Sequence, residues 1–345
     1  VSDNNTFTDP SYPVSYGGGI YNSGGTVTLI NSTVSSNTAD SYGGGIFNVN
    51  SGTVTLTNST ITGNSANDPN AGGGGGIANV SGSTVILTNS TVSGNTASYY
   101  QGGGIYNANG TATLTNSTIS GNTAMTAGGG GIYNNYSGTV TLTNSTISGN
   151  TASFYGGGIY NYSGTVTLTN STVSGNTSSS TASGGGIYNK STVTLQSSLI
   201  SGNEAAGIGN EVYNYGTFNA ARYNLFGHSG ETNAQAFAGS VAFTPGSTDI
   251  NATSDGGSTP SALASILSPL ADNGGPTMTH ALVAGSPAID LDAACSTGLT
   301  TDQRGYPRPE TVGTGCDAGS FEGGSISPAK NTAFLPAVYL LLLNK

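Results

Sequence analysis

The sequence contains very little charge, and positive charge is the scarcer sign. Lysine and arginine together number 6 among 345 residues, against 16 aspartates and glutamates, which gives a net charge of -10. Only 6% of the residues are charged, whereas an ordinary globular domain has about 25%. Nucleic acids and anionic membranes are bound by clusters of lysine and arginine. We therefore expect no nucleic-acid partner, and a surface built from hydroxyl and amide groups.

Long apolar runs are also missing. No stretch reaches the roughly 18 to 20 apolar residues that a membrane-spanning helix needs, so we expect no membrane span. The chain opens without a signal peptide, and Val1 to Asn4 repeat the pattern of Val34 to Asn37. We interpret this start, in the middle of a repeat, as a processed and secreted form.

Cysteine and histidine are too few to suggest a metal centre. The 2 histidines, His228 and His280, have no cysteine or histidine neighbour at metal-ligand spacing. The 2 cysteines, Cys295 and Cys316, are expected to form a disulfide if the protein is extracellular. We expect no metal and no cofactor.

Glycine is abundant, with 56 residues, and much of it belongs to a repeat. The motif GGGIYN places an aliphatic residue at Ile20, and the motif returns at intervals of 26, 31, 28, 27, 27, 28 and 25 residues. The recurring positions are Ile46, Ile77, Ile105, Ile132, Ile159, Ile187 and Val212. A fixed period in this range is typical of a solenoid.

Each repeat contains three segments with the pattern of short strands. In GTVTLTN, valine and leucine alternate with threonine, which is typical of a half-buried strand. GGGIYN and STISGN supply two further apolar segments between glycine and asparagine corners. We therefore predict an all-β fold, a right-handed parallel β-helix of about eight coils of ~27 residues with three short strands per coil and a C-terminal cap region.

The asparagine of GGGIYN recurs in every repeat and is predicted to form a ladder. Coils stack about 4.8 Å apart, so each amide can bond with the equivalent amide in the next coil. The predicted ladder consists of Asn22, Asn48, Asn79, Asn107, Asn134, Asn161, Asn189 and Asn214.

The repeats stop near His228, which divides the chain into three regions. Residues 1–228 form the predicted β-helix, residues 229–330 an irregular cap, and residues 331–345 an apolar tail. The tail is too short to span a bilayer and is predicted to be an assembly contact. Its apolar residues are Phe334, Leu335, Val338, Tyr339, Leu340, Leu341, Leu342 and Leu343.

Two parts of the chain resemble known families. GGGI, followed by YN or FN, resembles the repeats of secreted right-handed parallel β-helix proteins and of polymorphic outer-membrane proteins. The segments LSPLADNGGPTMTHAL, GSPAID, TDQRGYPRP and CDAGSFE, between Leu267 and Glu322, resemble the choice-of-anchor Q domain. These resemblances imply an exported, extracellular or cell-surface protein without an established activity. The charged residues Asp302, Arg304, Asp317 and Glu322 are expected to form pairs under the last coil.

An aromatic residue follows the aliphatic residue of nearly every repeat, and alternation places it on the outside. We interpret this stripe as a stabilising ladder, or as a binding or packing surface for sugar rings or a neighbouring rod. The loop residues Tyr16, Tyr42, Tyr100 and Tyr155 precede the glycines and extend it. The stripe consists of Tyr21, Phe47, Tyr106, Tyr133, Tyr160, Tyr188 and Tyr213, and Ala78 interrupts it.

Catalysis and ice binding are weaker interpretations of the same repeats. Cleavage of polysaccharides needs acids, or acids with a basic residue, on one face of the coils. No such set recurs at the repeat period, so we expect that the protein is not an enzyme. Rows of outward threonine, such as Thr53, Thr55 and Thr57, resemble ice-binding surfaces, but threonine is also a favoured strand residue.

We therefore predict an extracellular structural or adhesive β-solenoid protein. Its expected partners are copies of itself, stacked head to tail through an open N-terminal coil and the apolar tail. The alternative is a carbohydrate-binding surface module that uses the aromatic stripe on polysaccharide or cell-surface glycans.

Overall fold

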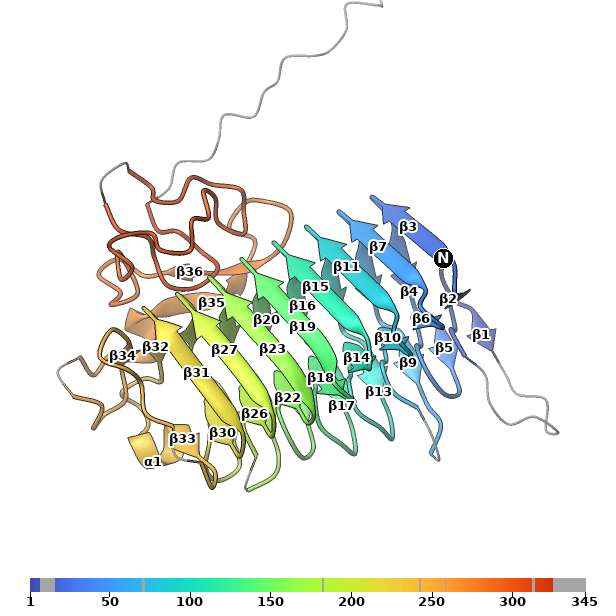
Figure 1. Ribbon diagram of the computed structural model, residues 1–345, viewed down its shortest axis with the longest axis horizontal. Coiled ribbons are helices and arrows are strands. Elements are labelled where there is room, and N and C mark those ends of the chain that lie inside the picture. The colour runs from blue at the N-terminus through green and yellow to red at the C-terminus, as the bar shows by residue number, and fades with distance from the viewer. Residues whose placement is uncertain are drawn as a thin grey trace, which may run out of the picture.

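The repeats form coils that stack along one axis (Figure 1). This computed structural model describes residues 1–6, 16–69, 72–181, 183–241, 243–257, 259–311 and 314–324. The predicted all-β parallel β-helix of about eight coils is confirmed. The predicted tail, residues 331–345, lies outside the described residues.

Each of the first seven coils contributes four short strands, so the prediction of three was wrong. The fourth is the Thr-Ala pair that follows the Ser-Gly-Asn corner, as where Thr96 and Ala97 pair with Thr123 and Ala124. Two residues carry too little alternation to mark a strand in the sequence. We number the coils from Ile20, so that coil 1 contains β2 to β5 and coil 8 contains β30 to β32.

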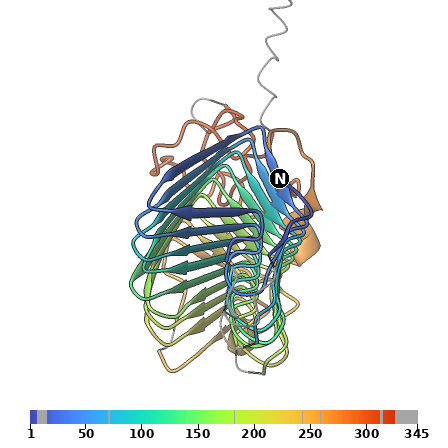
Figure 2. The same ribbon diagram turned by 90° about the vertical axis from the view of Figure 1, so that its right-hand side faces the viewer.

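Equivalent strands of successive coils pair in parallel and form four sheets (Figure 2). The first sheet contains β1 (Asn5–Thr6), β5 (Thr38–Ala39), β9 (Ser65–Ala66), β13 (Thr96–Ala97), β17 (Thr123–Ala124), β21 (Thr151–Ala152), β25 (Thr177–Ser178) and β29 (Glu204–Ala205). The second sheet contains β2 (Ile20–Ser23), β6 (Ile46–Val49), β10 (Ile77–Val80), β14 (Ile105–Ala108), β18 (Ile132–Asn135), β22 (Ile159–Asn161), β26 (Ile187–Asn189), β30 (Val212–Asn214) and β33 (Phe237–Ala238).

The other two sheets contain the TVTLT and STIS segments of the repeats. The third sheet contains β3 (Thr26–Ile30), β7 (Thr53–Thr57), β11 (Thr84–Thr88), β15 (Thr111–Thr115), β19 (Gly138–Thr143), β23 (Gly164–Thr169), β27 (Thr192–Gln196) and β31 (Thr217–Arg222). The fourth sheet contains β4 (Thr33–Ser35), β8 (Thr60–Thr62), β12 (Thr91–Ser93), β16 (Thr118–Ser120), β20 (Thr146–Ser148), β24 (Thr172–Ser174), β28 (Leu199–Ile200), β32 (Leu225–Phe226) and β34 (Ile250–Asn251).

The centre of every coil is filled by aliphatic side chains. In coil 5, Ile132, Val140, Leu142 and Ile147 are completely buried and belong to one continuous core. Burial of each such side chain contributes about 1.5–3 kcal/mol. The same four positions recur in the neighbouring coils, so the core is a set of aliphatic columns parallel to the axis.

The asparagines of the second sheet form a continuous row of hydrogen bonds. Asn107 Nδ2 donates to Asn134 Oδ1 at 2.8 Å, and Asn134 Nδ2 donates to Asn161 Oδ1 at 3.0 Å. Asn134 Nδ2 also donates to the carbonyl oxygen of Gly138 at 2.9 Å, at the corner that follows its strand. These bonds satisfy amides that would otherwise be buried without partners.

A second asparagine row, which we did not predict, runs between the fourth and first sheets. Asn122 Nδ2 donates to Asn150 Oδ1 at 2.9 Å, and Asn150 Nδ2 donates to Asn176 Oδ1 at 2.9 Å. The serine of each NST triplet forms a third row, in which the Ser117 amide donates to Ser145 Oγ at 3.2 Å. Two of the four corners of a coil are thus joined to the next coil by asparagine side chains and a third by serine side chains.

The glycine run before each isoleucine is required by backbone geometry. Gly102 has φ +75°, a conformation that side chains other than glycine rarely adopt. At Gly103, an added Cβ would lie 2.5 Å from the carbonyl oxygen of Gly130 in the next coil. The run therefore lets adjacent coils approach closely at this corner.

Aromatic rings cover the C-terminal end of the core. β33 and β34 add a partial ninth layer to the second and fourth sheets, with α1 (Asn233–Ala236) before them. Phe243 lies 5.0 Å from Phe226 and 5.4 Å from Phe237, between ring centroids. These phenylalanines replace the aliphatic columns where the repeat ends.

Residues 259–311 and 314–324 pack along the side of the β-helix, over the fourth sheet (Figure 1). We call this segment the lateral module; it contains η1 (Leu263–Ser265) and the hairpin of β35 (Leu267–Ala271) and β36 (Thr279–Leu282). Gln303 bonds with the side chains of Thr118 at 2.8 Å and Thr146 at 2.6 Å. The Gly319 amide donates to the Ser197 carbonyl at 2.8 Å, so the module contacts coils 4 to 7.

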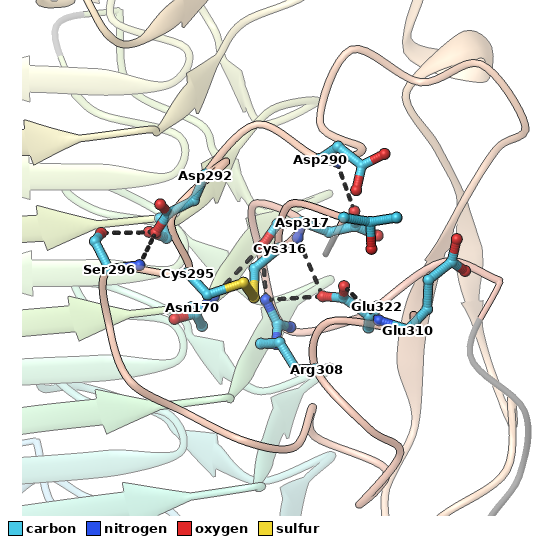
Figure 3. Close-up of a disulfide and its surroundings, with 12 residues drawn as sticks. Asn170, Asp290, Asp292, Cys295, Ser296, Arg308, Glu310, Cys316, Asp317 and Glu322 are labelled. Carbon is cyan, nitrogen blue, oxygen red and sulfur yellow. Dashed lines mark hydrogen bonds and ion pairs between the residues drawn. A yellow bond between two sulfur atoms is a disulfide. The ribbon is translucent and has the colours of Figure 1, made fainter. Parts of the chain in front are cut away.

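The lateral module is held together by a disulfide and buried charges (Figure 3). Cys295 and Cys316 form the disulfide, with Cα atoms 5.1 Å apart. Arg308 lies 3.3 Å from Glu322, and Arg304 lies 2.7 Å from Asp302. Of the four charged residues expected to pair, Asp302 and Arg304 bind each other, Glu322 binds Arg308, and Asp317 accepts from the backbone amides of Asp290 and Gly323. The expectation that they lie under the last coil was wrong, because the module packs along the side of the coils. No helix among the described residues is long and apolar enough to cross a membrane.

Replacing an asparagine of the first row should destabilise the β-helix. In Asn134→Ala, Asn161 Oδ1 loses its side-chain donor and Asn107 Nδ2 loses its side-chain acceptor inside a buried row. We expect the free energy of unfolding to fall by about 2–3 kcal/mol, measured by chemical denaturation. Thr139→Ala, at an exposed strand position, is the control and should cost less than about 1 kcal/mol. Equal losses of unfolding free energy in the two variants would contradict a stabilising role for the asparagine row.

The contact of His280 with the coils should make stability depend on pH. His280 Nε2 accepts from Ser148 Oγ at 2.8 Å, and Nδ1 donates to the Ser268 carbonyl at 2.7 Å, so both nitrogens are used by the neutral ring. Burial lowers the pKa of His280 below its usual 6.5. Its contribution is therefore complete above about pH 6.5 and is lost as the pH falls toward the lower folded-state pKa.

We expect the stability difference between the wild type and His280→Gln to shrink as the pH falls from about 7.5 to about 5. Comparison of the two chains cancels the titration of other groups, and denaturation at each pH measures the difference. A difference independent of pH would contradict this assignment.

Candidate functional site

The aromatic residues that follow the aliphatic position form a column along the outside of the second sheet. Successive ring centroids are 5.4 Å apart for Tyr106 and Tyr133, and 5.1 Å apart for Tyr133 and Tyr160. Tyr160 and Tyr188 are also 5.1 Å apart, and Tyr188 and Tyr213 are 5.3 Å apart. Parallel register places one ring per coil, so the column follows directly from the repeat.

Most of this column is not open to solvent, which favours the interpretation as a stabilising ladder over that as an exposed binding surface. Tyr133 is 4% exposed and Tyr188 is 4% exposed, whereas Tyr21 in coil 1 is 54% exposed. The loops before the glycines fold over the column, and the Tyr155 ring lies 4.7 Å from Tyr188. Burial also raises the pKa of the Tyr133 hydroxyl. Beyond the first coil the column is therefore chiefly a packing element.

The column is interrupted in coil 3, where Ala78 has no ring. The loop residue Tyr42 takes up the space, with its ring 5.8 Å from Phe47 and 5.7 Å from Tyr106. Tyr16 stacks on Phe47 with centroids 4.9 Å apart. The rings of neighbouring coils thus remain in contact here, but they are less deeply covered than in later coils.

A groove of about 610 Å³ opens at this point, and we call it the aromatic groove. Tyr21 is 54% exposed and Tyr136 is 66% exposed, so the lining presents ring surface to solvent. Ser81 and Asn109 supply a hydroxyl and an amide. The complete lining is Tyr16, Tyr21, Tyr42, Phe47, Val49, Val80, Ser81, Tyr106, Ala108, Asn109 and Tyr136.

The groove has a chemical character suited to an uncharged ligand. None of its lining residues, all described, carries a carboxylate or a basic side chain. Asp68 lies near Tyr42, where its charge adds to the burial that raises the pKa of that hydroxyl. Flat ring faces beside hydroxyl and amide groups can hold a molecule with both apolar faces and polar edges.

Sequence reasoning found part of this site. Tyr21, Phe47 and Tyr106 belong to the predicted stripe, and Tyr16 and Tyr42 are the loop residues predicted to extend it. Tyr136, Ser81 and Asn109 were missed, although each occupies a turn after the second sheet with φ between +48° and +55°. The only sequence signal for the groove is Ala78, which breaks the aromatic repeat.

The outward threonines of the third sheet form regular columns between coils. Thr55 is in register with Thr28 and Ile86, and Thr141 is in register with Thr113 and Thr167. The outward residues of β7, Thr53, Thr55 and Thr57, are half-buried. Ile86 interrupts the central column, so the polar grid is discontinuous.

Comparison with known proteins identifies the repeat region. A family model described as right handed beta helix region matches residues 1–173 and 103–244, which together cover more than half of the chain. No curated protein and no solved structure matches the chain.

Removal of a buried ring of the column should destabilise the protein more than removal of an exposed ring. In Tyr133→Ala, the loss of a buried ring leaves a cavity between Tyr106 and Tyr160. We expect the free energy of unfolding to fall by about 3–5 kcal/mol. Tyr21→Ala removes an exposed ring and should cost less than about 1 kcal/mol by the same denaturation measurement. If both substitutions cost little, the column is not a packing element.

Proposed function

We propose that this chain, which belongs to the right-handed β-helix family, is a non-catalytic, extracellular adhesive module that binds carbohydrate in the aromatic groove. Members of the family include both enzymes and non-enzymes, so the proposal is argued from the site itself. The observation that carries this proposal is the set of exposed tyrosine rings, Tyr16, Tyr21 and Tyr136, in a groove that also contains Ser81 and Asn109. Sugar rings have apolar C–H faces and hydroxyl edges, which such a lining complements.

The composition of the groove favours binding over cleavage. Glycoside hydrolysis uses two carboxyl groups about 5–9.5 Å apart around the scissile bond. The lining residues instead supply phenol, hydroxyl, amide and aliphatic groups. The absence of charge in the lining also favours a neutral oligosaccharide over an acidic one, because a buried contact with a carboxylate or sulfate requires a partner charge.

The disulfide and the low charge support a location outside the cell. Disulfides persist in oxidising compartments and are rare in the cytosol, and the chain uses both of its cysteines in one bond. A surface rich in threonine, serine and asparagine side chains suits contact with hydrated glycans. Head-to-tail stacking of subunits stays a prediction, because the tail that it requires lies outside the described residues.

The test is binding of the intact chain to neutral polysaccharides, measured on a glycan array and by affinity electrophoresis. We expect the double substitution Tyr21→Ala and Tyr136→Ala to weaken binding at least about fivefold, since stacked rings contribute roughly 0.5–1.5 kcal/mol each. Tyr99→Ala is the control, because Tyr99 is 49% exposed and does not line the groove.

Circular dichroism should show that all three chains remain folded. Failure of the intact chain to bind any neutral glycan would refute the proposal. Equal binding by the double variant and the control would place the contact elsewhere on the rod.

A further inference from the structure

Three potential metal ligands meet at the C-terminal end of the β-helix, far along the chain from the aromatic groove. Glu211 precedes β30, His228 follows β32, and Glu231 precedes α1. One ligand atom from each residue lies within 4.8 Å of the others. The chain thus brings two segments, Glu211 before β30 and the turn from His228 to Glu231, to one point where the regular coils end.

Both carboxylates are buried, and they face each other. Glu211 is completely buried and Glu231 is 3% exposed. Both ion pairs found among the described residues lie in the lateral module, so neither carboxylate has a lysine or arginine partner there. Two adjacent buried carboxylates need either a shared proton or a cation.

The hydrogen bonds around the two acids leave one oxygen available. Glu211 accepts from the Gly202 amide at 2.7 Å and from Asn203 Nδ2 at 2.6 Å, and so ends the second asparagine row. Glu231 Oε2 accepts from Asn210 Nδ2 at 2.9 Å. Glu231 Oε1 is buried and has no hydrogen-bond partner. An unpartnered buried carboxylate oxygen beside a second carboxylate and an imidazole is a strong acceptor for a cation.

Gly227 lies close to that oxygen, and the Thr253 methyl group packs against the same glycine. Gly227 has φ +72°, and a Cβ at this position would lie 3.2 Å from Glu231 Oε1. His228 is half-buried, and its Nδ1 accepts from the Gly230 amide at 3.0 Å. Coordination through Nδ1 would replace this bond, and coordination through Nε2 would move the ring proton to Nδ1 and break it. Either choice exchanges one exposed hydrogen bond for a metal bond.

We propose that Glu211, His228 and Glu231 bind one divalent transition-metal ion, with Zn²⁺ as the best match. An imidazole nitrogen with two carboxylate oxygens suits zinc, whereas calcium requires six or more oxygen ligands. Ligand atoms around a tetrahedral zinc lie about 3.4 Å apart, so rotation of His228 toward the acids would complete the site. The ion would join coil 8 to the segment before α1 and neutralise the buried acids.

The test uses the whole chain, stripped with EDTA and titrated with Zn²⁺ by calorimetry. We expect one Zn²⁺ per chain, a rise of several degrees in the midpoint of thermal unfolding at ~100 times Kd, and a tetrahedral visible spectrum with Co²⁺. Glu231→Gln should weaken the affinity at least tenfold. Glu204→Gln, an exposed acid in coil 7, is the matched control and should bind as the wild type does.

His228→Ala is a second variant, which tests the proposal even if Glu231→Gln does not fold. The imidazole is partly exposed, and its removal leaves the paired acids in place. This variant should also lose at least tenfold in affinity and should change the Co²⁺ spectrum. Absence of saturable Zn²⁺ binding by the stripped wild type would mean that the acids share a proton only, and would overturn the proposal. Affinity unchanged in both His228→Ala and Glu231→Gln would overturn it as well.

Discussion

The spacing between coils is the constraint on which the rest of the structure depends. Strands about 4.8 Å apart in parallel register place every residue directly beside its equivalent in the next coil. A buried polar side chain inside the rod can therefore be satisfied by the same residue of the next coil. Asparagine suits this arrangement, since its amide both donates and accepts, and the bond from Asn134 Nδ2 to Asn161 Oδ1 at 3.0 Å is one of a long series. The same register turns isoleucine into a core column and tyrosine into an aromatic column.

The fold could be predicted from the sequence because successive coils repeat the same pattern of apolar residues, asparagine and glycine. The period, the alternation in TVTLT and the recurring asparagine of GGGIYN determine the sheets and the first row of amides. The fourth strand escaped prediction because a Thr-Ala pair carries no alternation. The second asparagine row was visible in the sequence as a fixed spacing, but nothing in one sequence showed that its amides would be buried.

The candidate site was only partly predictable, for a related reason. Alternation correctly placed Tyr133 outside the central core, but it contains no information about what else covers that face. Loop residues such as Tyr155 cover it, and loops vary in length from repeat to repeat. The lateral module escaped prediction in the same way, since its docking over the fourth sheet depends on contacts such as Gln303 with Thr146 between residues 157 positions apart. Long-range contacts without a repeat leave no periodic trace.

The lateral module changes how the rod can open. In a solenoid each coil normally contacts only its neighbours, so that coils can separate one by one from an end. The module forms hydrogen bonds with coils 4 to 7 and is expected to act as a splint, so that those coils open as one cooperative unit. Among the described residues, these hydrogen bonds do not reach coils 1 to 3, so local unfolding is expected to begin there, in the part of the rod that carries Tyr21 and most of the aromatic groove. The least restrained end of the rod is thus the end with the best candidate for ligand binding, and a ligand held across those coils would restrain them in turn.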